Sequence, residues 1–241
     1  MGTITVNGIV CRHTDYREND RIITIYTQEM GRLDANARGA KKNKSPLLNA
    51  TQPFVYGEFV LFFSKDKYTV NTAYVKESFY PLRSNLDRFA AGIHLLKMTS
   101  GGAQPGDANE KIFSLLYHSI SFLSYTEVDP KDITLGFLLH YLDYHGYRPL
   151  IISCAQCGAD LRQQNEFGFS SEAGGALCGL CAKDKFVSKL TLEAMRRILL
   201  LKDEELYKIK LGHNVKLELE RILYPYAEYL FDRKIKPYTS Y

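Results

Sequence analysis

Apolar and polar positions alternate in short runs over the first 80 residues, and the rest of the chain repeats its apolar positions at helical spacing. The short runs are rich in β-branched and aromatic side chains, which favour extended strands; they lie at residues 3–10, 21–27, 32–38, 54–63 and 68–75. Turn-forming segments, such as the one at Gly31, separate most of them. Five short strands with few helical residues between them favour a small closed barrel such as an OB-fold, because a lone sheet leaves its edges unpaired.

Helical periodicity begins after Pro81. Segments in which apolar residues recur about every 3.6 positions lie at residues 84–99, 108–125, 129–146, 191–201, 203–211 and 215–232. Ser84 and Asp87 resemble a capping pair, and Gly146 is a suitable C-terminal cap. Pro225 should kink the last helix or mark its first turn. We therefore predict an α+β chain, with an OB-fold domain at residues 1–80 and a helical domain at residues 81–241.

Two Cys-x-x-Cys pairs interrupt the helical part, inside an insertion at about residues 150–185. The first pair is Cys154 and Cys157, and the second, Cys178 and Cys181, follows after twenty residues. A two-residue spacer lets a tight turn bring two sulfurs onto one ion, and four thiolates are a typical ligand set for structural zinc. The alternatives are two coincidental pairs or two disulfides, and a reducing compartment disfavours disulfides. We predict one structural zinc ion with no coordination position open for catalysis.

Length and composition limit the class of protein. The chain of 241 residues is 45% hydrophobic with a net charge of +4, and none of its apolar runs approaches the roughly 20 residues that a membrane span needs. The N-terminus lacks the basic and then apolar profile of a signal peptide. We therefore expect a cytoplasmic protein without membrane contact, in which the fifth cysteine, Cys11, is a small core side chain.

Positive charge concentrates at residues 38–45, here named the basic loop. Arg38, Lys41, Lys42 and Lys44 lie in it without an acidic residue, and Arg32 precedes it. On a barrel with many aromatic residues, such a loop suits single-stranded nucleic acid, because cations follow phosphates and rings stack on bases. The candidate rings, about half of which should belong to the core, are Tyr26, Phe54, Tyr56, Phe62, Phe63 and Tyr68. A solvated loop is the alternative, and composition alone does not decide between the two.

Catalytic motifs are missing from the sequence. The histidines form no HExxH pair, and neither a GxSxG elbow nor a P-loop is present. His140 and His145 are expected to be surface or capping residues near a helix end. An enzyme acting on nucleic acid is disfavoured, because the chain has no evident carboxylate cluster or nucleophile. We predict that the protein is not an enzyme.

Several motifs occur together over nearly the whole chain. They are Glu-Asn-Asp-Arg at 18–21, Tyr-Thr at 26–27 with Gly31, the basic segment at 37–45, Gly-Tyr-Arg-Pro at 146–149, and the cysteine pairs with Gly-Gly-Ala-Leu-Cys at 174–178. In this combination the chain resembles the RecO family of bacterial recombination mediators. The resemblance implies an N-terminal OB-fold, a helical C-terminal domain and, as in many members, zinc.

The resemblance also implies a function in DNA repair. RecO proteins bind single- and double-stranded DNA, anneal complementary strands, and work with RecR to load RecA onto DNA covered by single-stranded-DNA-binding protein. A cytoplasmic, nucleoid-associated location follows. The alternative, from another class, is a zinc-stabilised protein–protein adaptor that does not bind DNA directly.

RecO relatives also touch the acidic tail of single-stranded-DNA-binding protein. Lys189, Arg196 and Arg197 are the candidate contacts here, because such a groove of cations and apolar side chains suits an acidic and aromatic peptide. The apolar neighbours are Leu190, Leu192, Met195 and Leu199. An amphipathic core helix with a basic outer side is the other interpretation of the same pattern.

Overall fold

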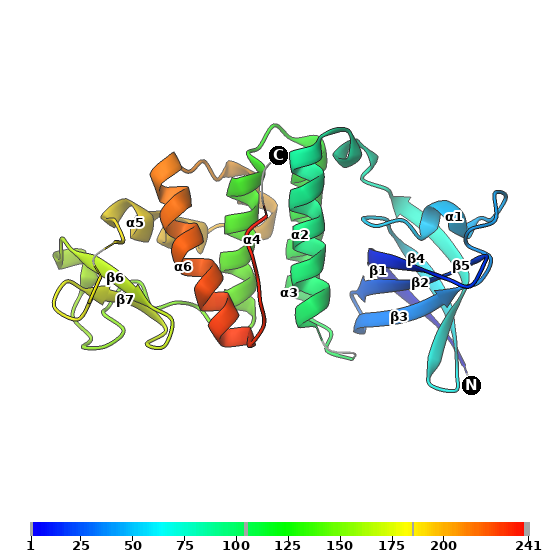
Figure 1. The fold of residues 1–241 in the computed structure, drawn as a ribbon, viewed down its shortest axis with the longest axis horizontal. Helices are drawn as coiled ribbons and strands as arrows, with labels where there is room; N and C mark the ends of the chain where they lie inside the picture. Colours follow the sequence, from blue (N-terminus) through cyan, green and yellow to red (C-terminus); the bar gives the residue numbers. More distant parts are fainter. Residues whose placement is uncertain (1, 104–105, 185, 239–241) are drawn as a thin grey trace. The chain divides into compact units, whose positions relative to one another are not determined.

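A computed structural model describes residues 2–103, 106–184 and 186–238. The chain divides into two compact units, Met1–Tyr125 and Thr126–Tyr241. The first unit holds β1 (Gly2–Tyr16), β2 (Asp20–Thr27), β3 (Gly31–Ala37), α1 (Leu47–Ala50), β4 (Tyr56–Ser64), β5 (Lys67–Glu77), the 3-10 turn η1 (Tyr80–Ser84), α2 (Leu86–Gly102) and α3 (Glu110–Tyr125) (Figure 1). The predicted N-terminal strands followed by helices are confirmed.

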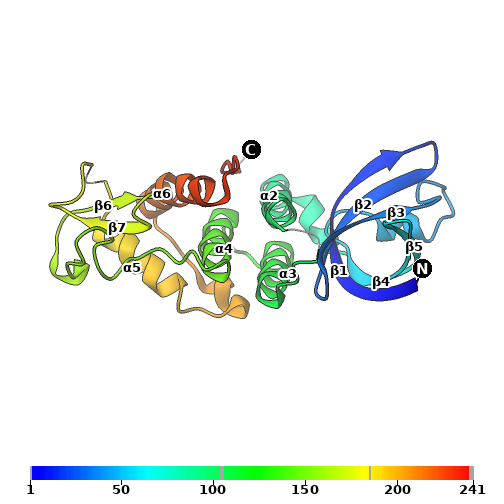
Figure 2. The ribbon, with the colours of Figure 1, turned by 90° about the horizontal axis from the view of Figure 1, so that it is seen from below.

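The five N-terminal strands form one sheet that closes on itself. Antiparallel ladders join β1 to β2, β2 to β3, β4 to β5 and β1 to β4, and a short parallel ladder joins β3 to β5. The order around the closed barrel is β1-β2-β3-β5-β4, and the strands curve around a common interior (Figure 2). Closure pairs the backbone groups that edge strands would expose. β1 continues beyond its predicted end, to Tyr16.

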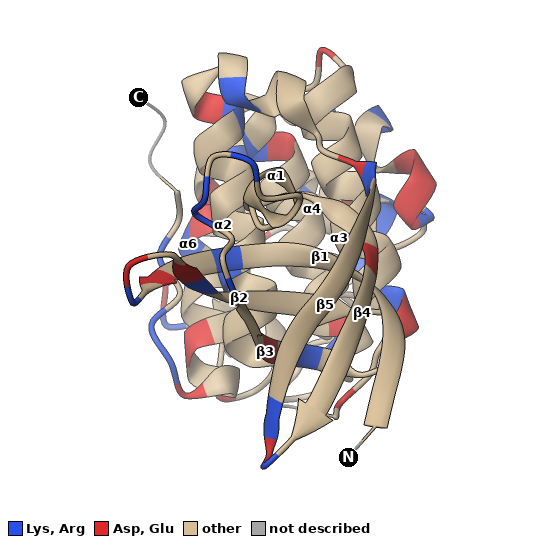
Figure 3. Cartoon of the chain, turned by 90° about the vertical axis from the view of Figure 1, so that its right-hand side faces the viewer, with Lys and Arg blue, Asp and Glu red and all other residues tan. Residues whose placement is uncertain are grey.

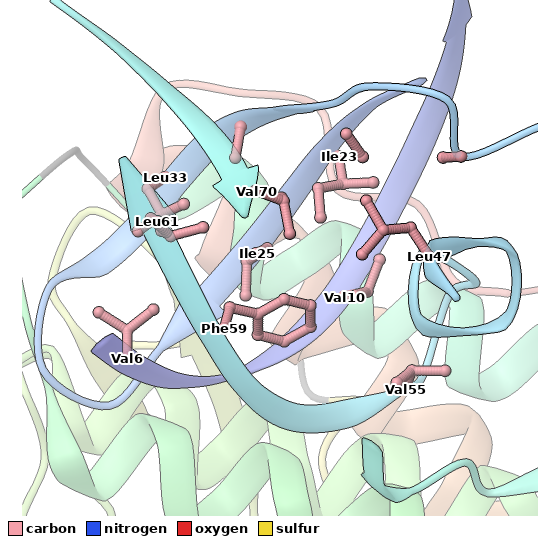
Figure 4. Close-up of a cluster of buried hydrophobic side chains, with 13 residues drawn as sticks. Val6, Val10, Ile23, Ile25, Leu33, Leu47, Val55, Phe59, Leu61 and Val70 are labelled. Carbon is pink, nitrogen blue, oxygen red and sulfur yellow. The ribbon is translucent and has the colours of Figure 1, made fainter. Parts of the chain in front are cut away.

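A hydrophobic core fills the barrel. Successive residues of a strand point to opposite faces, so Phe59 and Leu61 of β4 are fully buried while Phe62 is 37% exposed. Leu47 of α1 joins the same cluster and lies near Val10 (Figure 4). The short helix α1, which the strand and helix patterns did not predict, therefore contributes to the barrel core.

Helices α2 and α3 pack against each other and complete the first unit. The ring of Phe113 on α3 stacks on Tyr26 of β2, with 6.4 Å between ring centroids. The N-cap of α2 is Asn85, whose side chain accepts the N–H of Arg88 at 3.0 Å, so the predicted capping by Ser84 is wrong by one residue. The strands end at Glu77, near the predicted boundary at residue 80, whereas the compact unit extends to Tyr125.

The second unit is helical apart from one small hairpin. Its elements are α4 (Pro130–Tyr144), the 3-10 turn η2 (Leu161–Gln163), β6 (Phe167–Ser170), β7 (Gly175–Cys178), α5 (Lys189–Ile198), the 3-10 turn η3 (Asp203–Lys208) and α6 (His213–Phe231). Gly146 adopts a φ of 82° just after α4, as a C-terminal cap requires. Pro225 lies inside α6, not in its first turn.

Two further observations concern the helices. The segment predicted as a helix at 203–211 forms only the turn η3, after which the backbone of Ile209 is extended. None of the helices in the described part of the chain is both long and apolar enough to cross a lipid bilayer.

Candidate nucleic-acid interface and metal centre

The basic loop is anchored to the barrel and to the turn between β1 and β2. Ala40 is fully buried within the barrel core. The carboxylate of Asp20 accepts the N–H of Gly39 at 2.8 Å, and the carbonyl of Asn19 accepts the N–H of Lys41 at 3.0 Å. Gly39 has a φ of 66°, in the left-handed region where glycine carries no steric penalty. The loop therefore holds its side chains on a fixed backbone.

The predicted DNA-contact residues differ in how far their charges are already paired. Arg38, Lys42 and Lys44 are exposed and make no ion pair with any residue that the structure describes. The ammonium of Lys41 lies 3.0 Å from the carboxylate of Asp15. Arg32 is half-buried, because its guanidinium donates to the carbonyl of Ser100 at 3.2 Å. Three of the five cations are thus available to a phosphate backbone.

Asp15 is the acidic neighbour of the basic loop. Its carboxylate pairs with Lys41 and, at 3.4 Å, with Arg21. The hydrogen bond from Lys41 lowers the pKa of Asp15 below its ordinary value, so Asp15 is ionised at neutral pH. Figure 3 shows the acidic and basic residues of the β1–β2 turn beside the blue segments of the loop that leads into α1. Asp15 therefore offsets part of the positive charge.

Three of the six aromatic residues considered from the sequence are covered by other side chains, whereas Phe62 is 37% exposed. Tyr26 and Phe54 are at most 1% exposed, and Tyr56 packs edge-on against Phe113 of α3, with 6.1 Å between ring centroids. The sequence analysis missed Tyr16, which is 40% exposed at the end of β1. It was missed because residue 16 lies beyond the predicted end of that strand.

The two cysteine pairs meet at one place in the second unit. The sulfur atoms of all four residues lie within 4.8 Å of one another, and those of Cys157 and Cys178 are 3.7 Å apart. Four sulfurs placed tetrahedrally at about 2.3 Å from a zinc ion are about 3.8 Å from each other, whereas a disulfide needs about 2.05 Å. The cluster formed by Cys154, Cys157, Cys178 and Cys181 therefore fits one tetrahedral metal ion.

A close backbone approach brings the pairs together. The N–H of Ala176 in β7 donates to the carbonyl of Leu150 at 2.8 Å, and its carbonyl accepts the N–H of Ala155 at 2.9 Å. The first pair therefore lies alongside β7, whose last residue begins the second pair. Gly175 permits this approach, because a Cβ at that position would lie 2.3 Å from the carbonyl oxygen of Leu150.

Backbone N–H groups stabilise the thiolate form of Cys154. The N–H of Cys178 points at the sulfur of Cys154, 3.4 Å away. Burial raises the pKa of the Cys154 thiol, but hydrogen bonds from the backbone of Cys178, Cys157 and Gln156 outweigh burial and lower this pKa to about 6. The thiolate is the form that ligates metal. The chemistry of the donors, like their spacing, therefore suits zinc.

Helix α5 carries the residues predicted to bind an acidic tail. Lys189 and Arg197 are exposed, whereas the guanidinium of Arg196 donates to the carbonyl of Ile151 through Nε at 3.2 Å and Nη2 at 2.5 Å. Arg196 thus holds the start of the cysteine insertion to α5.

The structure exposes only part of the predicted apolar side of the peptide groove. Leu192 and Met195 are 1% and 0% exposed, because they face the core of the second unit. Leu190, which belongs to the predicted apolar set, is 67% exposed, and Leu200, which follows α5, is 83% exposed.

His140 is a buried structural residue, contrary to the predicted surface or capping position. Its Nε2 lies 2.9 Å from the carbonyl oxygen of Ile198, and its Nδ1 lies 3.4 Å from the hydroxyl of Tyr144. That hydroxyl donates to Asp203 at 2.7 Å. These hydrogen bonds of His140 and Tyr144 link α4 to the end of α5 and to η3. His145, by contrast, bonds the carbonyl of its own helix end, as predicted.

These features together define a class of protein. It is an α+β protein with a closed five-stranded N-terminal barrel, an anchored basic loop, and a helical remainder that carries a four-cysteine cluster.

Comparison with known proteins identifies the family. Residues 1–79 match the family described as recombination protein O, N terminal, and residues 83–238 match recombination protein O, C terminal. The chain belongs to the RecO family, and the resemblance noted from its motifs is confirmed.

Individual relatives match this chain over nearly their whole length. The chain is 34% identical to a DNA repair protein RecO of Alkaliphilus metalliredigens, covering 95% of this chain and 94% of that protein. It is 32% identical to the protein of that name from Acetivibrio thermocellus, covering 100% of this chain and 95% of that protein. It is 31% identical to the DNA repair protein RecO of Desulforamulus reducens, covering 98% of this chain and 93% of that protein. Each of these relatives is named as a DNA repair protein.

Proposed function

We propose that this protein is a DNA-binding recombination mediator that anneals complementary strands and, with RecR, loads RecA onto single-stranded DNA coated by single-stranded-DNA-binding protein. One observation carries the proposal: Arg38, Lys42 and Lys44 are exposed, without ion pairs to described residues, on a loop fixed to the barrel. The names of the RecO relatives support the same role in DNA repair. We assign DNA binding to a domain at residues 1–80 and the remaining contacts to residues 81–241.

The proposed DNA contacts are made to phosphates. Lysine is a flexible point charge without the planar fork that reads a base edge, so binding by Lys42 and Lys44 should be largely independent of sequence. The strand order of the closed barrel is consistent with an OB-fold, a fold that often binds oligonucleotides. Neutralising the charge of two strands at once would favour annealing, because the repulsion between two polyanions falls.

The salt dependence of binding to single-stranded DNA tests the proposal. Each lost phosphate contact flattens the log–log slope by about 0.7 on a single strand, so Lys42→Ala with Lys44→Ala should flatten it by about 1.4. The matched control is Lys234→Ala with Lys236→Ala, which removes the same charge from exposed positions after α6. An equal effect of both pairs would show that only net charge matters. No binding by the unchanged protein would favour the protein–protein adaptor.

We also propose that Cys154, Cys157, Cys178 and Cys181 hold one structural zinc ion. Their spacing and the hydrogen bond from the N–H of Cys178 to the sulfur of Cys154 support this assignment. Four protein ligands complete a tetrahedral shell, so the ion would fix the local fold and supply no reactive water. Metal analysis of freshly reduced protein should find about one zinc per chain; less than half an equivalent would contradict the assignment.

The surface around α5 is the proposed contact for the acidic tail. Lys189 and Arg197 supply positive charge and Leu190 supplies exposed apolar area. A groove elsewhere in the second unit is a poorer match, since Glu127 and Asp129 are among the residues that line it. A tail peptide should bind more tightly than a scrambled one, and Lys189→Ala with Arg197→Ala should remove the difference. Equal binding of both peptides would refute this contact.

A further inference from the structure

Part of the outer face of the β1–β2 hairpin is exposed to solvent. Tyr16 pairs with Asp20, and Thr14 pairs with Ile22. These residues share one face, and it is the outer face because the neighbouring Ile23 belongs to the barrel core. Nearer the other end of β2, Tyr26 is covered by α3. Tyr16 and Ile22, in contrast, are 40% and 36% exposed.

A cation accompanies the exposed ring of Tyr16. The guanidinium carbon of Arg17 lies 5.2 Å from the centroid of that ring, within the range of a cation–π contact. Arg17 is exposed and has a φ of 56°, a left-handed conformation that is uncommon for a residue with a Cβ. The turn thus presents an aromatic ring and a positive charge side by side.

The ring lies next to the basic loop. Asp20, the pairing partner of Tyr16, accepts the N–H of Gly39, and Asn19 of the same turn accepts the N–H of Lys41. Asp15, the residue before Tyr16, pairs with Lys41. Three separate contacts therefore fix the position of the aromatic residue relative to the cations that follow Gly39.

We infer that Tyr16 is a stacking platform for a base of single-stranded DNA whose phosphates lie along the basic loop. An aromatic ring next to a row of cations is the arrangement that binds single strands, because every base has a π-face and every nucleotide carries a charge. Arg17, whose guanidinium carbon lies 5.2 Å from the centroid of the Tyr16 ring, adds positive charge near the base. The inference rests on the proposed DNA binding and adds the residue that distinguishes single strands from duplex.

Replacement of Tyr16 should weaken binding to single-stranded DNA and leave binding to duplex unchanged. Tyr16→Ala should reduce affinity for a single-stranded oligonucleotide about 10-fold, which is within the range for loss of one base–aromatic stack. The salt slope should stay unchanged, since no charge is lost. Affinity for a blunt duplex should also stay unchanged, because paired bases are not available to the ring. Tyr16→Phe should bind single strands as the unchanged protein does.

Fluorescence gives a second readout. The chain contains no tryptophan, so Tyr16→Trp introduces a sole tryptophan at the proposed platform. Its emission should be quenched by the single strand and not by the duplex. The matched control is Tyr74→Trp, at a tyrosine of β5 that is 59% exposed; its emission should not change.

The outcomes separate this inference from the function on which it rests. Tight, salt-sensitive binding to single strands, combined with no effect of Tyr16→Ala and no quenching of Tyr16→Trp, would refute the stacking platform and leave the proposed DNA binding intact. Equal quenching of Tyr16→Trp and Tyr74→Trp would also refute it. Absence of DNA binding by the unchanged protein would refute both.

Discussion

The barrel and the cysteine module, defined as residues 150–187, are stabilised in different ways. The barrel closes five strands around thirteen buried residues, among them Phe59 and Leu61. The module has two strands of four residues each, and Leu161 and Phe167 are among its few fully buried apolar side chains. Segments of this size seldom bury enough apolar area to fold alone and use disulfides or metal instead.

The difference assigns a separate role to each region. A barrel with its own core can hold a basic loop in place without metal, because Ala40 of that loop is part of the core. We expect the module to depend on its four sulfurs, so that its structure follows the occupancy of the proposed zinc site. DNA contact and metal content should therefore respond to different substitutions.

Loss of metal should give the largest effect. Structural zinc contributes about 10 kcal/mol or more to folding in small zinc domains, so chelation or Cys157→Ser should unfold the module. Amide hydrogens of β6 and β7 should lose their protection against exchange, while those of β1–β5 should keep it. The readout is hydrogen exchange with metal analysis on the same sample.

The control for this experiment is Cys11→Ser, because Cys11 is buried in the barrel and lies outside the cluster. It should retain zinc. Simultaneous loss of protection in the barrel and the module after chelation would contradict the separation of the two regions.

Truncation of a core residue of the barrel should destabilise the barrel, by less than loss of metal destabilises the cysteine module. Phe59 is fully buried, and truncation of such a side chain typically costs about 3–5 kcal/mol. Phe59→Ala should therefore lower the denaturation midpoint of the barrel and weaken DNA binding, without changing zinc content. Phe62→Ala, at an exposed position of the same strand, should have little effect on unfolding. Zinc loss from the Phe59 variant would show that the regions are coupled.

Substitution of Asp15 should give the smallest effect, and it should strengthen DNA binding instead of weakening it. Asp15→Asn removes a negative charge beside the basic loop and releases Lys41 from its ion pair. Affinity for single-stranded DNA should rise a few-fold at low salt, and the salt slope should steepen by up to about 0.7, the value for one phosphate contact.

The pH dependence of this ion pair has a defined sign. The pKa of Asp15 is lowered by Lys41, so the pair is present at neutral pH and is lost as the pH falls through that lowered pKa. Between pH 6 and 8 the variant and the unchanged protein should therefore differ by a constant factor. A difference that varies over this range would implicate another titrating group.

Local patterns in the sequence predicted much of the fold. Alternation marked the strands because each has one face in the barrel core, and β-branched residues such as Ile23 and Ile25 fill that face. The cysteine spacing predicted a cluster because two-residue spacers constrain the sulfurs locally. Gly146 predicted the end of α4, because the left-handed conformation of a C-terminal cap is also a local preference of glycine.

Other features depend on contacts between distant residues and were not predictable. Nothing near Leu192 shows that it faces the core, since the same amphipathic pattern is compatible with a groove. The pairing of Lys41 with Asp15 joins residues 26 positions apart in the sequence through the β1–β2 turn. The exposure of Tyr16 depends on where β1 ends and on which part of the sheet α3 covers.

Hydrogen exchange of the whole zinc-loaded protein, with and without a saturating single-stranded oligonucleotide, tests the central claim that the barrel presents the DNA site. We predict added protection at residues 16–21 and 38–45, and no change within residues 150–187. Added protection in the cysteine module, with none in the β1–β2 turn or the basic loop, would contradict the account.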